Sequence, residues 1–337
     1  MKKVFNLLVS FVLIVGFSAC SKDDSGNQQV PKNPVPSADY KGLALISSGE
    51  STVRLAQVGT PYEISLEYST DETHWEPYTI GETITLADST FLLFRNGEHK
   101  NRKFSKDDEN YYHFEISGPI SARGNIMSLL NRDFSTPLTF YGFFALFEGC
   151  TSLLSAPELP ATTMEKGCYS QMFAGCTALK SAPELPAEVL ATNCYGRMFK
   201  GCSALTYVPD LPATKMEAYC YNNMFANCTS LKFAPELPAK RLEPNCYHCM
   251  FEGCTNLTSA PELPATELVS NCYEFMYKDC RNLRYVIGLF TTEPSEKTTQ
   301  DWLSGVAASG TFIKSKKATW DVTGAHGIPE GWKIETW

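Results

Sequence analysis

The stretch Cys168–Pro186, CYSQMFAGCTALKSAPELP, decides the fold, because near copies of it recur along the chain. Its opening Cys-Tyr pair returns every 26 residues, at Cys168, Cys194, Cys220, Cys246 and Cys272. A second series of cysteines keeps the same spacing, at Cys150, Cys176, Cys202, Cys228, Cys254 and Cys280. A fixed period of this length is the sequence signature of stacked repeats.

Each repeat divides into a compact part around Cys-Tyr-x-x-Met-Phe and an extended part that begins near the Leu after the second cysteine. Cys168 and Met172 are four residues apart, as are Tyr169 and Phe173, so we predict a short helical turn that carries these pairs on one side. The prolines of the Ala-Pro-Glu-Leu-Pro segment limit the strand to a short one. Because one unit cannot bury its own apolar face, the sequence predicts a solenoid of five full coils and a partial sixth over residues 142–290.

The regions that flank the repeats have different patterns. We predict a small all-β, sandwich-like domain over residues 39–122, where Tyr62, Ile64, Leu66 and Tyr68 alternate with polar residues. Further strands are predicted at Thr83–Leu86, Phe91–Phe94 and His113–Ile116.

Both ends of the solenoid need a cap, because an open end exposes apolar surface. We assign residues 123–141 to an N-terminal cap or junction, and residues 291–337, which contain Trp302, Trp320 and Trp332, to a C-terminal cap. The predicted fold class is therefore mixed α/β: a solenoid of 26-residue units that follows a small all-β domain and is closed by a C-terminal cap.

The first residues are typical of an export signal. Lys2 and Lys3 precede an apolar run, over residues 4–17, that is too short to span a membrane, so we predict a signal peptide over residues 1–19. Phe17-Ser18-Ala19-Cys20 resembles a bacterial lipobox, which implies acylation of Cys20; an ordinary signal peptide with a coincidental cysteine is the alternative. Residues 20–38 are polar and are predicted to be a flexible tether.

A family resemblance rests on the repeat motif itself. The units Met-Phe-x-Gly-Cys-Thr-x-Leu followed by Ala-Pro-Glu-Leu-Pro-Ala resemble the BspA-like leucine-rich repeats of Bacteroides-type surface lipoproteins, and the acidic Ser21–Asp24 segment resembles their surface-export signal. The resemblance implies a lipid-anchored protein of the outer membrane, exposed at the cell surface, that adheres to a host or bacterial surface protein. A glycan-binding accessory lipoprotein for polysaccharide capture is the alternative function, and Trp75 is the only tryptophan of the β domain that could serve it.

Composition and motifs disfavour two other functions. The net charge of −8 and the pI of about 5.3 disfavour a nucleic-acid partner, which requires clustered Lys and Arg. The five histidines are scattered and no catalytic or cofactor motif occurs, so we expect neither an enzyme nor a cofactor. A cysteine nucleophile paired with His248 is conceivable, but the cysteines near it are repeat positions or their neighbours.

The twelve cysteines after Cys20 could form a disulfide ladder, bind metal or pack as free thiols. Equivalent positions of stacked coils lie about 5 Å apart, but their parallel Cβ vectors suit a disulfide poorly. Cys246 and Cys249 form the only C-x-x-C pair, whereas a zinc site needs four ligands. We therefore prefer buried free thiols, with some disulfides as the alternative.

Two surface rows are predicted from the same stacking. One row is acidic and consists of Glu158, Glu184, Asp210, Glu236 and Glu262. Its carboxylates either spread apart into solvent or share a bridging cation. We predict no metal site there. The other follows the strand leucines and contains the candidate binding residues Tyr207, Lys232, Phe233, Arg284 and Tyr285. Aromatic and Arg side chains most often dominate binding energy, so this second row is the predicted adhesive face; ordinary solvated positions are the alternative.

Lipid anchoring can be tested by substitution of the lipobox cysteine. We expect Cys20→Ser to move the protein from the membrane fraction to the soluble fraction, because no acyl chain can be attached. Fractionation of cells that express each form measures this. A variant that stays as membrane-bound as the parent would contradict the predicted anchor.

Overall fold

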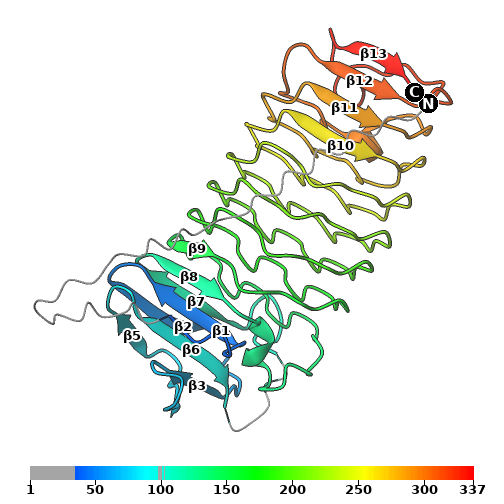
Figure 1. Cartoon of the computed structure of the whole chain (residues 1–337). Coiled ribbons are helices and arrows are strands. Elements are labelled where there is room, and N and C mark those ends of the chain that lie inside the picture. The colour runs from blue at the N-terminus through cyan, green and yellow to red at the C-terminus, as the bar shows by residue number, and fades with distance from the viewer. Residues whose placement is uncertain (1–34, 98–100, 102) are drawn as a thin grey trace, which may run out of the picture. The chain divides into compact units, whose positions relative to one another are not determined.

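The computed structural model describes residues 35–97, 101 and 103–337. In this part of the chain, strands and turns predominate; its one α-helix is α1 (Glu296–Thr299) and its one 3-10 helix is η1 (Ile126–Leu129). The predicted mixed α/β class is therefore wrong, whereas the repeats do stack as a solenoid (Figure 1). No helix among these residues has the length and apolar character needed to cross a membrane.

Two sheets face each other in the N-terminal region. A six-stranded sheet has the order β4-β3-β6-β1-β8-β9 and a three-stranded sheet the order β5-β2-β7. Phe94 of β6 packs 5.4 Å from Phe114 of β7, between the sheets. The strands are β1 (Leu43–Ser47), β2 (Ser51–Val58), β3 (Leu66–Ser69), β4 (Glu76–Pro77), β5 (Thr83–Leu86), β6 (Phe91–Asn96), β7 (Tyr111–Ser117), β8 (Ile120–Arg123) and β9 (Leu153–Ser155).

The alternating segment near Tyr62 differs from the strand that we predicted there. Only its end, from Leu66, lies in β3. The Tyr62 ring instead packs edge-on against Tyr112, with ring centroids 4.9 Å apart, and its hydroxyl donates to the Phe104 carbonyl. Aromatic packing in a loop therefore produced the same alternation as a half-buried strand.

The N-terminal sheets continue directly into the repeats. β8 pairs in parallel with β9, the extended segment of the first repeat, through Ile120 and Leu153. Phe114 of β7 stacks on Phe147 at 5.1 Å, and its N–H donates to the Leu146 carbonyl at 2.7 Å. The β region thus covers the apolar end of the first coil and serves as a cap, as an open solenoid requires.

The compact part of each repeat is a ribbon of turns and not the helical turn that we predicted. In residues 193–202, alternate N–H groups donate to the next repeat, for example Phe199 to the Met224 carbonyl at 2.9 Å. The N–H groups between them donate three residues back, for example Met198 to Tyr195 at 3.2 Å. We call residues 193–202 and their equivalents in the other repeats the turn ribbon. In an α-helix, every one of these N–H groups would donate to the carbonyl four residues earlier in the same segment.

Left-handed residues explain why no helix forms. Asn193, Arg197 and Gly201 have φ of 57°, 58° and 77°, so every fourth residue leaves the helical region. The last of these positions holds residues that tolerate this conformation in successive repeats, at Gly175, Gly201, Asn227, Gly253 and Asp279. The turn ribbon, like a helical turn, brings residues four apart to the same side. The side chains that we predicted to point inward therefore do so.

Identical side chains stack from repeat to repeat in the core. The rings of Tyr195 and Tyr221 lie 5.9 Å apart and those of Phe199 and Phe225 5.7 Å apart, and both pairs are nearly parallel. From Cys176 on, each cysteine of the second series donates a hydrogen bond to a phenylalanine carbonyl in the preceding coil, as Cys202 does to Phe173 at 3.1 Å. Cys150 donates to Phe114 of β7 in the same way. The buried face of each coil is therefore completed by its neighbours.

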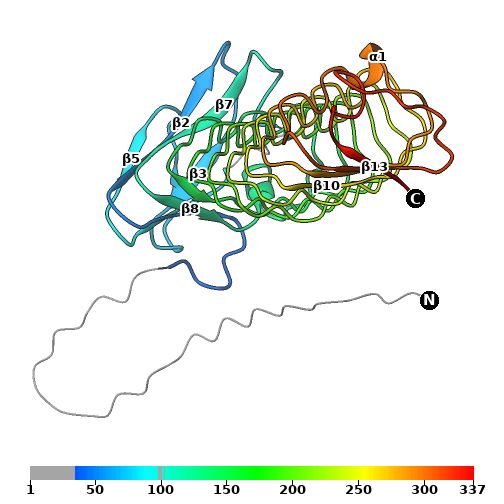
Figure 2. The ribbon, with the colours of Figure 1, turned by 90° about the horizontal axis from the view of Figure 1, so that it is seen from above.

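The C-terminal segment continues the stack and then closes it. A third sheet, of four strands, runs β10-β11-β12-β13, with parallel pairing between neighbours. Trp302 stacks on Tyr273 at 6.1 Å, and Trp320 stacks on Phe290 at 5.2 Å. Figure 2 shows β10 and β13 on one side of the coil and α1, which follows the turn ribbons, on the other. The strands are β10 (Ser259–Leu263), β11 (Tyr285–Gly288), β12 (Thr311–Lys314) and β13 (Lys333–Thr336).

The phenylalanine stack gives a direct test of the packing. Phe225 is fully buried, 5.7 Å from Phe199 and 5.6 Å from Phe251, so Phe225→Ala should lower the free energy of unfolding by about 3–5 kcal/mol. Phe233→Ala is the matched control, because that ring is 70% exposed, and it should cost less than about 1 kcal/mol. Denaturant titration of both variants measures the difference; equal losses would contradict this core.

Candidate functional site

The predicted binding residues lie on one side of the solenoid, in neighbouring extended segments. Parallel bridges join Ser181 to Tyr207 and Phe233 to Ser259, and β10 pairs with β11 through Ser259 and Tyr285. The three aromatic residues therefore occupy the same position in different repeats. The repeat that contains Ser259 separates Phe233 from Tyr285, so the row has a polar gap.

These aromatic side chains are open to solvent. The exposed fractions are 59% for Tyr207, 70% for Phe233 and 39% for Tyr285, and the cations Lys232 and Arg284 are exposed as well. Among the residues that the structure describes, none of these five side chains has a hydrogen-bond or ion-pair partner. We call the five residues the aromatic stripe.

The local backbone turns the stripe outward. Leu205 is buried at the end of a turn, where its N–H donates to the Cys202 carbonyl at 3.0 Å. In the corresponding part of a later repeat Leu283 is buried, the next two residues are exposed and Val286 is buried again. The buried leucine thus fixes the segment to the core, and the pair that follows it cannot point inward.

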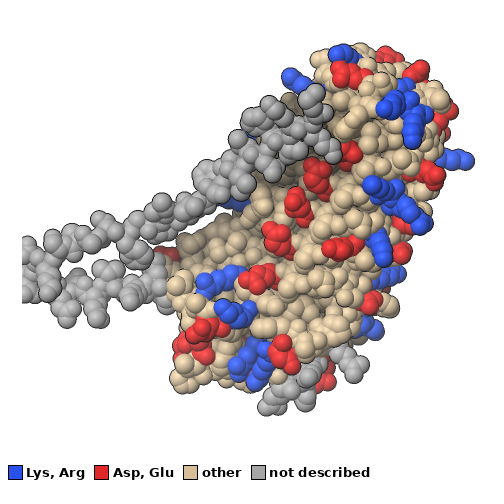
Figure 3. Space-filling model, turned by 45° about the vertical axis from the view of Figure 1, so that its right-hand side comes forward, with Lys and Arg blue, Asp and Glu red and all other residues tan. Residues whose placement is uncertain are grey.

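The acidic row runs along the same extended segments. Glu158, Glu184, Asp210 and Glu236 are exposed and Glu262 is half-buried. Figure 3 shows acidic side chains in a row across the stacked coils, with basic side chains gathered along one side of it. The described residues contain no group of three or more His, Cys, Asp or Glu side chains placed to hold a metal ion.

The repeat cysteines are buried free thiols. Burial raises the pKa of Cys202 and Cys254 to about 12, and each thiol donates a hydrogen bond to a neighbouring carbonyl oxygen. The thiolate is the reactive form of cysteine, and it is disfavoured here. These cysteines therefore pack as small apolar side chains.

The pair His248 and Cys249 does not form an activated nucleophile. The thiol lies 3.7 Å from the His248 Nε2 atom, which is also 3.4 Å from a Glu274 carboxylate oxygen. Burial raises the pKa of Cys249 to about 12 and also lowers the pKa of His248. Both shifts favour the neutral pair, whereas a nucleophilic cysteine needs a lowered pKa.

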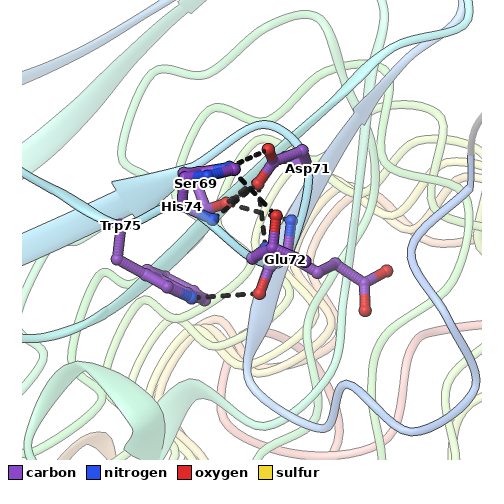
Figure 4. A network of polar contacts seen from close by, with 6 residues as sticks. Ser69, Asp71, Glu72, His74 and Trp75 are labelled. Atoms are coloured by element: carbon purple, nitrogen blue, oxygen red, sulfur yellow. Dashed lines mark hydrogen bonds and ion pairs between the residues drawn. The ribbon is translucent and has the colours of Figure 1, made fainter.

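Trp75, the candidate glycan platform of the β region, already has partners. The Arg95 guanidinium lies 3.8 Å from the centre of its ring, and the Tyr40 ring is 6.0 Å away. Figure 4 shows its indole N–H donating to the Glu72 carbonyl beside the Asp71–His74 pair. Because the cation covers one face of the ring, only limited stacking surface remains for a sugar.

A second surface feature lies on the turn ribbons and escaped the sequence analysis. It is a groove of ≈ 470 Å³ whose lining includes Tyr141, Gln171, Arg197 and Tyr219. All four residues have positive φ. The signal was present in the sequence as a departure from the repeat, because Tyr219 stands where other units have Gly167 or Asn193, but the helical interpretation gave those positions no special meaning.

Comparisons with family models, curated proteins and solved structures gave no match to this chain. The predicted lipidation site, Cys20, lies outside the described residues. The case for a function therefore rests on the surface of the solenoid.

Proposed function

We propose that this protein binds a partner protein through the aromatic stripe, as a lipid-anchored surface protein of the leucine-rich-repeat type. The observation that carries the proposal is the exposure of three large aromatic side chains at one repeat position, beside two cations without partners. Exposed aromatic residues in neighbouring repeats, such as Tyr207 and Phe233, are typical of interaction sites. Aromatic and Arg side chains also contribute most to the energy of protein interfaces.

The leucine-rich-repeat assignment is part of the same proposal. Its support is the buried leucine at the start of each extended segment and the outward pair that follows it. In this architecture the framework positions stay constant while the outward pair varies, and residues 206–207, 232–233 and 284–285 vary in this way.

The charge pattern defines the partner further. The acidic row lies three residues beyond the aromatic position in the same repeat, as Asp210 does beyond Tyr207. A partner that fits both would present apolar groups to Tyr207 and Phe233 and basic groups to the carboxylates. Ion pairs between the acidic row and basic groups of a partner would mainly raise the association rate, and they would weaken as the salt concentration rises.

We propose adhesion and not catalysis. Adhesion to a host or bacterial surface protein agrees with the expected anchor at Cys20, which would hold the stripe at the outer surface of the cell. Glycan capture through Trp75 is the weaker candidate, because Arg95 covers one face of the indole.

The stripe can be tested by removal of its three rings together. The triple variant Tyr207→Ser, Phe233→Ser and Tyr285→Ser should weaken attachment to immobilised matrix proteins and to bacterial cells about tenfold or more. Its melting temperature should stay close to that of the parent, because the rings are exposed.

Phe140→Ser is the matched control, since this ring is 60% exposed and lies outside the stripe. It should leave attachment unchanged. Full attachment by a well-folded triple variant would show that binding occurs elsewhere.

A further inference from the structure

The groove on the turn ribbons is separate from the aromatic stripe. Its lining comes from the compact part of several repeats, from Tyr141 to His248. The stripe lies on the strand side, and Figure 2 shows the strands and the ribbon side on opposite sides of the coil. A volume of ≈ 470 Å³ is within the range of small-ligand sites.

Side chains in strained backbone positions build the groove. Tyr219 has a φ of 61° and is 45% exposed. Its position in the repeat is a tyrosine again at Tyr141, but glycine or asparagine at Gly167, Asn193, Asn245 and Asn271. Arg197 and Gln171, with φ of 58° and 59°, project from the next left-handed position of their repeats. Bulky residues rarely adopt this conformation. The turn ribbon imposes it at this position in other repeats too, as at Cys249 and Phe275, so the groove is distinguished by the side chains placed there and not by the backbone angle.

The lining combines fixed amides with unpaired donors. Asn222 donates to the His248 ring at 2.9 Å, and Asn223 donates to Asn222 at 2.9 Å, so these groups are held in place. The side chains of Gln171, Arg197 and Tyr219 have no hydrogen-bond partner among the described residues. The groove therefore presents many hydrogen-bonding groups, some of them preorganised, to a ligand.

Charge in the groove favours an anion. Lys166 and Arg197 line it with one carboxylate, Asp108. Glu148 interacts electrostatically with Arg197, and Glu274 lies 3.4 Å from His248, so carboxylates act at the edge of the groove as well. His248 is held neutral, because burial lowers its pKa. The Arg197 guanidinium makes no hydrogen bond among the described residues, although it interacts electrostatically with Glu148. It has the planar donor geometry that matches a carboxylate.

The backbone gives an extended peptide nothing to pair with. Every N–H from Asn193 to Cys202 already donates, either to the next repeat or within the turn. Strand addition needs free backbone groups at a sheet edge, so recognition here must come from side chains. Amides, tyrosines and a cation suit a ligand with many hydroxyl groups.

We propose that this groove binds a short oligosaccharide that carries a carboxylate. The rings of Tyr141 and Tyr219 pack against sugar faces, and the amides of Gln171 and Asn193 bond to hydroxyl groups. Arg197 pairs with the carboxylate. Uronic acids and sialic acids are both sugars that carry a carboxylate and several hydroxyl groups.

Calorimetric titration of the purified protein tests the proposal. The acidic probes are a galacturonic acid trisaccharide and 3′-sialyllactose, which separate the two sources of carboxylate. Their neutral counterparts are galactotriose and lactose. At least one acidic probe should bind with a Kd below about 1 mM and about tenfold more tightly than its neutral counterpart.

Two variants assign binding to the groove. Arg197→Gln should remove the preference for the acidic sugar. Tyr219→Asn should weaken binding about tenfold without lowering the melting temperature, because asparagine suits the left-handed backbone better than tyrosine. Arg241→Gln, an exposed arginine outside the groove, is the control and should bind as the parent does.

Three results would overturn the proposal: no binding of either acidic probe at about 1 mM, equal binding of acidic and neutral sugars, or undiminished binding by both groove variants. Attachment through the aromatic stripe is measured separately and does not depend on these outcomes.

Discussion

The structure depends on alternate hydrogen bonding in the turn ribbon. Half of its N–H groups join neighbouring repeats and the other half close turns within the repeat, as Phe199 and Met198 illustrate. Buried backbone groups must find partners, and this division satisfies them without a helix or a wide sheet. It also fixes the register between coils, so identical rings such as Tyr195 and Tyr221 are brought into stacks. The β region and the C-terminal tryptophans then cover the two ends that stacking leaves open.

The same register creates the two surfaces to which we assign binding. On the strand side, a buried leucine in each repeat turns the following pair outward, and the aromatic stripe results. On the ribbon side, every fourth residue is left-handed, and some of these residues, such as Tyr219, are exposed. Arg197 and Tyr219, together with the left-handed Asn193, line the groove on this side. One framework can thus hold a protein partner and a small ligand on different sides.

The period, the inward residues and the aromatic stripe could be predicted from the sequence. In a stack of repeats, residues 26 positions apart occupy equivalent places, so a pattern seen in one repeat holds for the others. The backbone of the compact part could not. A spacing of four between Cys168 and Met172 fits a helix and a turn ribbon equally well. Glycine and asparagine mark only some of the left-handed positions, such as Gly201 and Asn193, whereas others hold residues such as Arg197. Likewise, the alternation at Tyr62 fitted a strand, but its cause is ring packing against Tyr112. The groove was missed because it depends on the left-handed positions.

The turn ribbon can be tested most directly by NMR measurement of couplings across its hydrogen bonds. The structure predicts a coupling between the Phe199 amide nitrogen and the Met224 carbonyl carbon, and another between the Met198 amide nitrogen and the Tyr195 carbonyl carbon. A coupling from Phe199 to the carbonyl of Tyr195, four residues back, would instead indicate a helix, and it would contradict the architecture on which both surfaces rest.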